Sequence, residues 1–285
     1  MANLKEIRNR IVSVSSTMQI TSAMKMVSAA KLKKAQDAIT AMRPYSQKLT
    51  ELIQGLSASL EGDVATEYTA QREVKKVLVV AITSNRGLCG ALNSNVLKQV
   101  KILTDKYGHD NVGIFAIGKK ANDGLHKTNY VIANRSYIFD DLTFDNTAEI
   151  AQSLTHLFLD GEYDKIELVY NQFVNAATQI VVNEQFLPLA PIKGASAIST
   201  DYIFEPSKEE IVLELIPKSL KTQLYKAIRD SFAAEHGARM TAMHKATDNA
   251  TDLRNQLKLT YNKARQAAIT GEILEIVGGA EALNN

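Results

Sequence analysis

The stretch that decides the fold is residues 218–277, which reads KSLKTQLYKAIRDSFAAEHGARMTAMHKATDNATDLRNQLKLTYNKARQAAITGEILEIV. It contains no proline and only two glycines, Gly237 and Gly271, and strong helix formers dominate it. A single helix of this length would be about 90 Å long, at about 1.5 Å per residue. A compact domain cannot cover such a rod, so we expect another element to bury its apolar stripe.

The apolar residues of this stretch recur at spacings of three and four, as in a coiled coil. They are Leu220, Leu224, Ala227, Ala234, Ala238, Ala242, Leu253, Leu257, Ala264, Ala268 and Val277. Residues 3–58 show the same spacing and predict a second long helix, which Pro44 interrupts or kinks. We therefore predict that the two terminal helices pair as a long antiparallel coiled coil. An ordinary helical bundle is the alternative, but the middle of the chain does not supply the third and fourth long helices that it needs.

The middle of the chain alternates between strand and helix patterns. Strands are expected at residues 77–82, 112–117, 130–139, 166–170 and 180–187. Helices are expected at 92–103, 119–127 and 150–158, the last capped by Asp145 or Asn146. This alternation is typical of an α/β sheet with crossover helices. The predicted domains are an N-terminal helix (1–60), an α/β head (61–205), entered by a turn at residues 61–63, and a C-terminal helix (206–285).

Charge is unevenly placed along the chain. The net charge is +7 over residues 1–50, −8 over 51–217 and +3 over 218–285. A basic helix can contact nucleic acid, acidic lipid or an acidic protein surface. Nucleic acid is disfavoured, because no aromatic residue interleaves with the N-terminal basic residues before Tyr45 and no reader motif appears. No run of eighteen apolar residues and no apolar signal core occur, so neither membrane insertion nor a transit peptide is expected.

Two glycine-containing segments resemble phosphate loops only in part. Residues 83–90, TSNRGLCG, follow a predicted strand and open a helix, but G-x-G-x-x-G is absent. The alternative is a tight turn whose glycines permit close packing. Residues 113–120 have P-loop spacing, but the four residues between the glycines are a predicted buried strand. The five histidines show no metal spacing, and Cys89 has neither a local catalytic partner nor a second cysteine to pair with. We therefore predict no catalytic, cofactor-binding or metal-binding residue.

Residues 19–31, QITSAMKMVSAAK, combine methionines with small residues, which make a smooth and adaptable helix face. Such a face suits a shaft that turns against a partner. A tightly packed alanine seam is an equally good interpretation.

Three segments carry a resemblance to the gamma subunits of the rotary F-type ATP synthase. They are residues 11–36, residues 86–93 (RGLCGALN), and a C-terminal set that comprises 238–243 (ARMTAM), 246–250 (ATDNA) and 261–279. The chain departs from the family in having Asn85 where Asp is frequent and Ala91 in place of a second glycine. It also lacks the inserted cysteine pair of the chloroplast form, so the resemblance is to a bacterial form without that redox control.

The resemblance implies a non-catalytic rotor. Its terminal helices would lie inside a ring of three alpha and three beta subunits, which bind the nucleotides. Its Rossmann-like head would stand on the ring of c subunits, hold the epsilon subunit, and lie at the cytoplasmic face of the bacterial inner membrane without inserting into it. Ion flow would turn the ring and the shaft together. The rival interpretations are a nucleotide-dependent enzyme with a helical arm and a coiled-coil scaffold.

By position, the resemblance assigns two groups of partner-binding residues. Contacts with the beta subunits fall on Met24, Arg239, Arg265 and Gln266. Arg265 would donate charge-assisted hydrogen bonds to acidic beta residues. Contacts with the c ring and epsilon fall on Arg43, Pro44, Tyr45, Tyr202 and Glu205.

Overall fold

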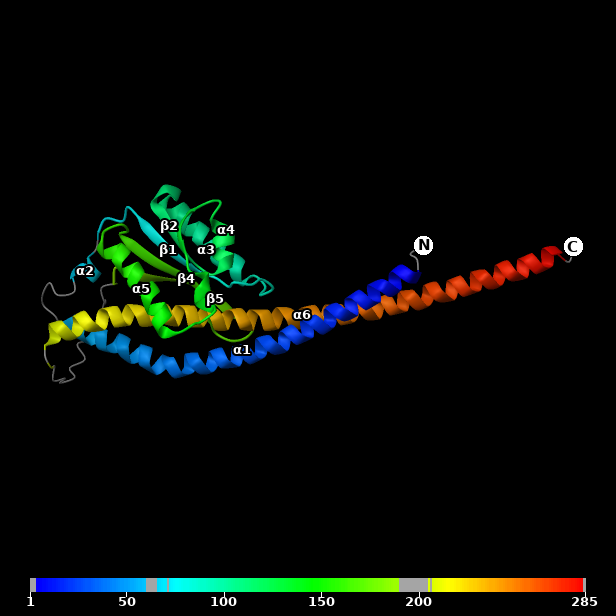
Figure 1. Ribbon diagram of the computed structural model, residues 1–285, viewed down its shortest axis with the longest axis horizontal. Coiled ribbons are helices and arrows are strands. Elements are labelled where there is room, and N and C mark those ends of the chain that lie inside the picture. The colour runs from blue at the N-terminus through cyan, green and yellow to red at the C-terminus, as the bar shows by residue number, and fades with distance from the viewer. Residues whose placement is uncertain (1–3, 60–65, 71, 190–204, 206, 284–285) are drawn as a thin grey trace. The chain divides into compact units, whose positions relative to one another are not determined.

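A computed structural model describes residues 4–59, 66–70, 72–189, 205 and 207–283. The chain divides into two compact units, one of Met1–Ser28 with Met240–Asn285 (unit 1) and one of Ala29–Arg239 (unit 2). The two long helices, α1 (Leu4–Ser59) and α6 (Lys208–Leu283), contribute to both units (Figure 1). The predicted long terminal helices are therefore confirmed. The predicted turn at residues 61–63 lies outside the described residues, and the domain boundaries at 60 and 205 stay a prediction.

Unit 2 contains a five-stranded sheet in the order β3-β2-β1-β4-β5. Its strands are β1 (Val77–Ile82), β2 (Val112–Ile117), β3 (Tyr130–Asn134), β4 (Lys165–Phe173) and β5 (Gln179–Leu187). The first four are parallel, and β5 pairs antiparallel with β4 at one edge. Crossover helices between parallel strands produce this order, and the predicted Rossmann-like α/β architecture is confirmed.

Helices cover both faces of this sheet, which explains why β1 and β2 are buried at every position. On one face, α3 (Leu92–Tyr107) and α4 (Lys119–Leu125) pack on one set of alternating strand residues. On the other face, α5 (Phe144–Leu159) and the first part of α6 bury a larger core. The α6 residues in that core are Ile216, Leu220, Leu224, Ala227 and Ile228. Unit 2 therefore binds α6 to the sheet through side chains that water does not reach. The short elements are α2 (Thr66–Thr69), η2 (His109–Asn111) and η3 (Ser136–Phe139).

Two local predictions in the middle of the chain were wrong. The strand expected at residues 130–139 ends at Asn134, whose Oδ1 accepts a hydrogen bond from the backbone N–H of Ser136. Such a side-chain bond turns the backbone out of the strand. The cap of α5 is Thr143, not Asp145 or Asn146, because the Thr143 hydroxyl accepts the backbone N–H of Asn146 at 3.3 Å.

The proline-free run of residues 218–277 is only part of the C-terminal helix, which was predicted to span residues 206–285. Helix α6 begins at Lys208 and carries Pro217 in its interior. An interior proline loses one backbone hydrogen bond and costs about 3 kcal/mol. Ile216 and Leu220, each 1 % exposed, flank it and pack into the core of unit 2. Full burial of such side chains contributes about 1.5–3 kcal/mol each, which offsets the cost.

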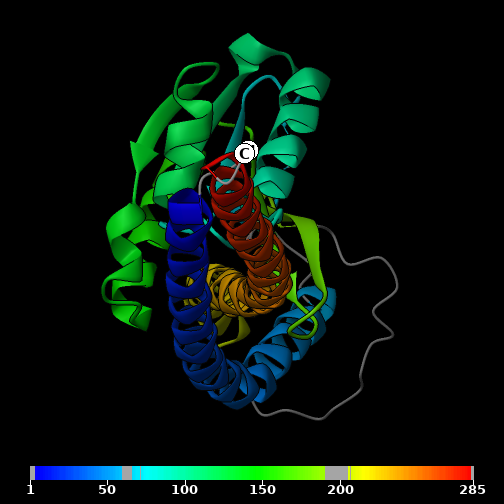
Figure 2. The same ribbon diagram turned by 90° about the vertical axis from the view of Figure 1, so that its right-hand side faces the viewer.

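In unit 1, α1 and α6 run antiparallel, side by side (Figures 1 and 2). In the side-chain contacts between them, the residue numbers on α1 rise as those on α6 fall, as antiparallel pairing requires. Thr251 Oγ1 lies 3.3 Å from Met18 Sδ, the hydroxyls of Thr21 and Thr247 are 2.8 Å apart, and Lys25 Nζ lies 3.3 Å from His244 Nδ1. The predicted antiparallel pairing is confirmed here. Its seam is narrow and partly polar rather than a row of leucines.

Candidate functional surfaces

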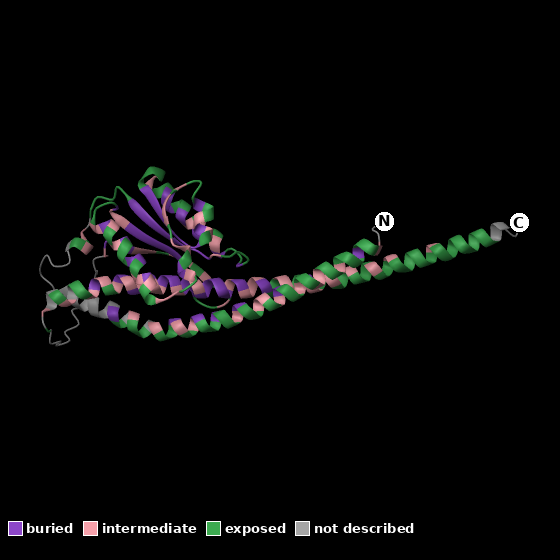
Figure 3. Ribbon diagram, viewed as in Figure 1, coloured by how far each residue is buried: buried purple, intermediate pink, exposed green. Residues whose placement is uncertain are grey.

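The C-terminal part of α6 presents apolar side chains to water. Beyond Arg254 the helix is almost entirely exposed (Figure 3). Its exposed large apolar residues are Leu259, Ile269, Ile273, Leu274, Ile276 and Val277, and α1 adds Val12, Ile20, Met26 and Val27 in the same unit. Large exposed apolar patches mark interaction sites. These side chains are therefore the candidate residues for such a site in unit 1.

Two of the predicted beta-contact residues lie on this exposed part of α6. Arg265 and Gln266 are exposed, and within the described part of the chain neither side chain has a hydrogen-bond or ion-pair partner. An exposed arginine without such a partner can bind a carboxylate of another chain through its planar guanidinium. Met24, on α1 in the same unit, is half-buried. Its flexible thioether side chain adapts to the shape of a neighbour.

The residues predicted to face the c ring and epsilon are only partly described. Pro44 and Tyr45 are adjacent and exposed on α1, and Glu205 is exposed. Tyr202 and the side chain of Arg43 lie outside the described residues. The structure therefore shows that Pro44, Tyr45 and Glu205 are exposed, and the contacts of the whole group stay a prediction.

Arg239, the remaining predicted beta contact, is buried in unit 2. The residue is 7 % exposed, and its guanidinium bonds to Glu235 Oε1 at 2.7 Å and to the carbonyl oxygens of Arg86 at 3.1 Å and Gly87 at 3.2 Å. Its charge is thus used within this chain, while the predicted contact with a beta subunit stays a prediction. Sequence reasoning missed Glu235, although its i, i+4 spacing to Arg239 on a helix could have indicated the pair.

Two titratable groups around Arg239 have shifted pKa values. Burial raises the pKa of Glu235, and the nearby charges of Arg239, Lys31 and Arg86 oppose this shift without cancelling it. Burial and the charges of Arg239 and Lys31 lower the pKa of His236 to about 4. His236 is therefore neutral near pH 7, and Arg239 carries the positive charge that faces Glu235.

The carbonyls that Arg239 contacts belong to the turn between β1 and α3, residues 84–90. Leu88 and Gly90 both adopt φ +63°, and Leu88 is 64 % exposed. The interpretation that the glycines of this turn allow close packing is wrong. A Cβ at Gly87 or Gly90 would meet nothing within 4 Å, and what Gly90 supplies is its left-handed backbone.

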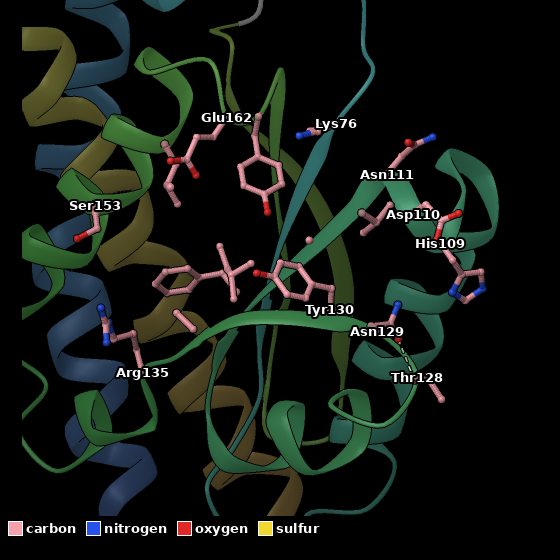
Figure 4. A pocket seen from close by; sticks show the side chains of 17 residues that line it. Lys76, His109, Asp110, Asn111, Thr128, Asn129, Tyr130, Arg135, Ser153 and Glu162 are labelled. Carbon is pink, nitrogen blue, oxygen red and sulfur yellow. Dashed lines mark hydrogen bonds between the residues drawn. The ribbon is translucent and has the colours of Figure 1, made fainter.

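A cavity of about 900 Å³ lies beside β2 and β3 in unit 2. Figure 4 shows Lys76, His109, Arg135 and Glu162 on different sides of it, so their charged groups do not converge on one point. Such a lining does not assemble a catalytic site. Within the described ranges, no three His, Cys, Asp or Glu side chains could hold a metal ion, and no helix is long and apolar enough to cross a bilayer.

Comparisons with known proteins agree along the whole chain. The sequence model of the family described as ATP synthase matches residues 3–283. The ATP synthase gamma chain of Flavobacterium johnsoniae is 79% identical over 285 residues and covers 100% of both chains. The ATP synthase gamma chain of Geobacter sp. is 43% identical over 99% of both.

Solved structures share the fold. A chain of the central stalk and c ring of the Tetrahymena thermophila mitochondrial ATP synthase matches with a TM-score of 0.60 and 25% identity, over 80% of this chain and 99% of that one. A chain of the Euglena gracilis mitochondrial ATP synthase matches with a TM-score of 0.70 and 21% identity, over 98% of this chain and 94% of that one.

Proposed function

We infer the function from one premise: the chain belongs to the family of ATP synthase gamma chains. As a gamma chain it is the central-stalk rotor subunit of an F-type ATP synthase, with the alpha, beta and epsilon subunits and the c ring as its partners. Which surface of the chain faces which partner is proposed here from the exposure and charge of its side chains.

We propose that the exposed part of α6 is the surface that the alpha and beta subunits cover. The observation that carries this proposal is the set of large apolar side chains between Leu259 and Val277 that α6 leaves exposed. Arg265 and Gln266 lie within this stretch and would bind beta-subunit carboxylates. Because one face of the helix differs from the next, each beta subunit meets a different set of side chains. The shaft thus contributes a different contact free energy to each catalytic site, and its rotation exchanges those states.

The other assigned residues follow the same logic. Met24, half-buried on α1, would adapt to the beta subunits as they change shape. Because the guanidinium of Arg239 is buried, we propose that Arg239 acts on the beta subunits indirectly, through the turn at residues 84–90 that it binds. Arg43, Pro44, Tyr45, Tyr202 and Glu205 would face the c ring and epsilon. The exposure of Pro44, Tyr45 and Glu205 supports this assignment.

We further propose that the chain performs no chemistry itself and that it works as a peripheral subunit at the cytoplasmic face of the bacterial inner membrane. Family membership supports both statements, because the nucleotides of the complex would lie on alpha and beta. The division into helix (1–60), head (61–205) and helix (206–285) belongs to the same proposal.

The first test is to tag this chain in its own cells, purify the complex gently, and record partner masses together with ATP hydrolysis. One copy with three alpha and three beta chains in an active complex is expected. Recovery of the chain alone, or as a homodimer without ATPase activity, would overturn the proposal.

The second test concerns Arg265. Arg265→Glu places a like charge opposite acidic residues, and we expect coupled ATP synthesis to fall about tenfold or more while the complex still assembles. Lys263→Glu is the matched control, because Lys263 is an exposed cation two positions away, on roughly the opposite side of the helix. Equal losses in both variants would contradict the assignment of Arg265.

A further inference from the structure

We propose that Arg239 and Glu235 are positioning residues that lock the turn at residues 84–90 onto α6, so that the turn and this part of the helix move as one body. This inference rests on the proposed function for its consequence in coupling. The lock itself stands on the contacts within unit 2.

The guanidinium of Arg239 spans the two elements. From α6 it donates to the carbonyl oxygen of Arg86 through one terminal nitrogen at 3.1 Å, and to that of Gly87 through the same nitrogen at 3.2 Å and through Nε at 3.4 Å. These partners are 152 or 153 positions away in the sequence. A planar, five-donor group can hold two successive carbonyls in a fixed orientation, which an ammonium group cannot do.

Glu235 fixes the guanidinium in turn. Its Oε1 accepts from the second terminal nitrogen of Arg239 at 2.7 Å, and the two side chains are 10 % and 9 % exposed. A buried ion pair is expensive to desolvate, and an apolar pair of similar volume often stabilises a protein as well or better. What the ion pair supplies here is direction: it aims the remaining donors of Arg239 at the turn.

Several hydrogen bonds also hold the turn to elements other than α6. Ser84 Oγ donates to the Arg86 carbonyl at 2.6 Å, and Asn93 Oδ1 accepts the Ser84 N–H at 3.0 Å. Asn85 bonds to the Ser136 carbonyl at 2.9 Å and accepts the Lys119 N–H at 2.9 Å. These bonds attach the turn to α3, α4 and η3, and Arg239 attaches the same turn to α6. A force applied to the exposed apex at Leu88 therefore reaches the helix through the guanidinium instead of bending a loose loop.

Cys89 reports on this lock without any added label. It lies in the turn, is 1 % exposed, and its Sγ accepts from Asn93 Nδ2 at 3.2 Å. The rate at which a maleimide modifies Cys89, followed by mass spectrometry of its peptide, measures how often the turn opens. The purified ATP synthase complex is the material for this experiment.

Two variants remove the lock in different ways. Arg239→Lys keeps the charge beside Glu235 but loses the planar fork, and the double variant Arg239→Met with Glu235→Met removes both buried charges at similar volume. In both we expect Cys89 to be modified about tenfold faster. Arg229→Lys is the control, because Arg229 lies on the same helix and binds the Leu142 carbonyl, away from the turn. Unchanged labelling in both Arg239 variants, or the same acceleration in Arg229→Lys, would overturn the lock. If the double variant does not assemble, Arg239→Lys decides.

The coupling readout is the number of protons pumped per ATP hydrolysed, in inverted membrane vesicles. A residue that only stabilised the fold would lower pumping and hydrolysis together through loss of complex. We expect Arg239→Lys instead to lose more than half of the pumping per ATP hydrolysed, in complexes that still assemble. Faster labelling with unchanged pumping per ATP would refute the role in coupling. Failure of the wild-type complex to contain alpha and beta subunits would refute the proposed function, whereas the labelling rates would still decide the lock.

Discussion

Leu224→Ala tests whether the buried core is what fastens α6 to the sheet. Leu224 is 0 % exposed and packs in the core that α5, α6 and one face of the sheet share. Replacing a buried leucine by alanine removes its transfer free energy and leaves a cavity, for a total cost of about 2–5 kcal/mol. Leu224 is fully buried in this core, so we take a value within that range, about 3 kcal/mol.

Hydrogen exchange of the β4 amides in the purified complex measures this cost. At about 1.4 kcal/mol per factor of ten, a loss of 3 kcal/mol corresponds to exchange about a hundredfold faster. Leu213→Ala is the matched control, because Leu213 lies on the same helix and is 48 % exposed. We expect it to change exchange by no more than about two- to threefold, which corresponds to about 0.5 kcal/mol. If both variants accelerated β4 exchange equally, the core would not be the element that holds α6.

Three further changes test other parts of the account. Gly118→Ala places a Cβ 2.1 Å from the carbonyl oxygen of Thr83 at a φ of +111°, so we expect the free energy of unfolding to fall by about 3 kcal/mol or more. Gly87→Ala is the control, because its Cβ meets open space and the free energy of unfolding should change by no more than about 0.5 kcal/mol. Thermal denaturation of the complex compares the two variants. Burial alone would raise the pKa of Glu167, but hydrogen bonds from Lys165, Asn183 and Tyr107 outweigh it and hold the pKa below its usual value. A carboxylate whose pKa is lower in the folded state stabilises the fold at pH values above its unfolded-state pKa of about 4.3, and this stabilisation is lost as the pH falls through the folded-state pKa. In denaturation experiments, the loss of unfolding free energy caused by Glu167→Gln should therefore be largest near pH 7 and should shrink below about pH 4. Ala268→Leu adds bulk on the exposed face of α6, and a rotor predicts an assembled complex with reduced coupled ATP synthesis, whereas a scaffold that only joins partners would tolerate it.

The helices and strands could be predicted because their signals are local. A run without proline or glycine up to Arg43 marks most of α1, and a proline-free run with only two glycines marks most of α6. Continuous apolar runs such as residues 77–82 mark strands covered on both faces. The passage of α6 through Pro217 does not follow from such local signals. Its local penalty at Pro217 is offset by the burial of Ile216 and Leu220 against a sheet that is distant in sequence.

Among the candidate partner-binding residues, local sequence was likewise informative for some and not for others. Arg265 and Gln266 were expected to face a partner, and their exposure agrees with that expectation, although no partner contact tests it. Arg239 was placed with them by resemblance, but its surroundings depend on the turn more than 150 residues earlier in the chain. A helix sequence carries the Glu235–Arg239 spacing and no signal of the carbonyls that Arg239 binds. Long-range contacts of this kind are what local pattern cannot supply.

The most direct test of the rotor account is to watch this chain turn. Lys101, exposed on α3, can be replaced by cysteine and biotinylated to carry a bead, since the buried Cys89 reacts slowly by comparison. The complex is fixed to a surface through its beta subunits and supplied with ATP. The account predicts stepwise rotation of the bead in one direction, lost without ATP and impaired by Arg265→Glu but not by Lys263→Glu. ATP hydrolysis at the normal rate with a bead that does not rotate would contradict it.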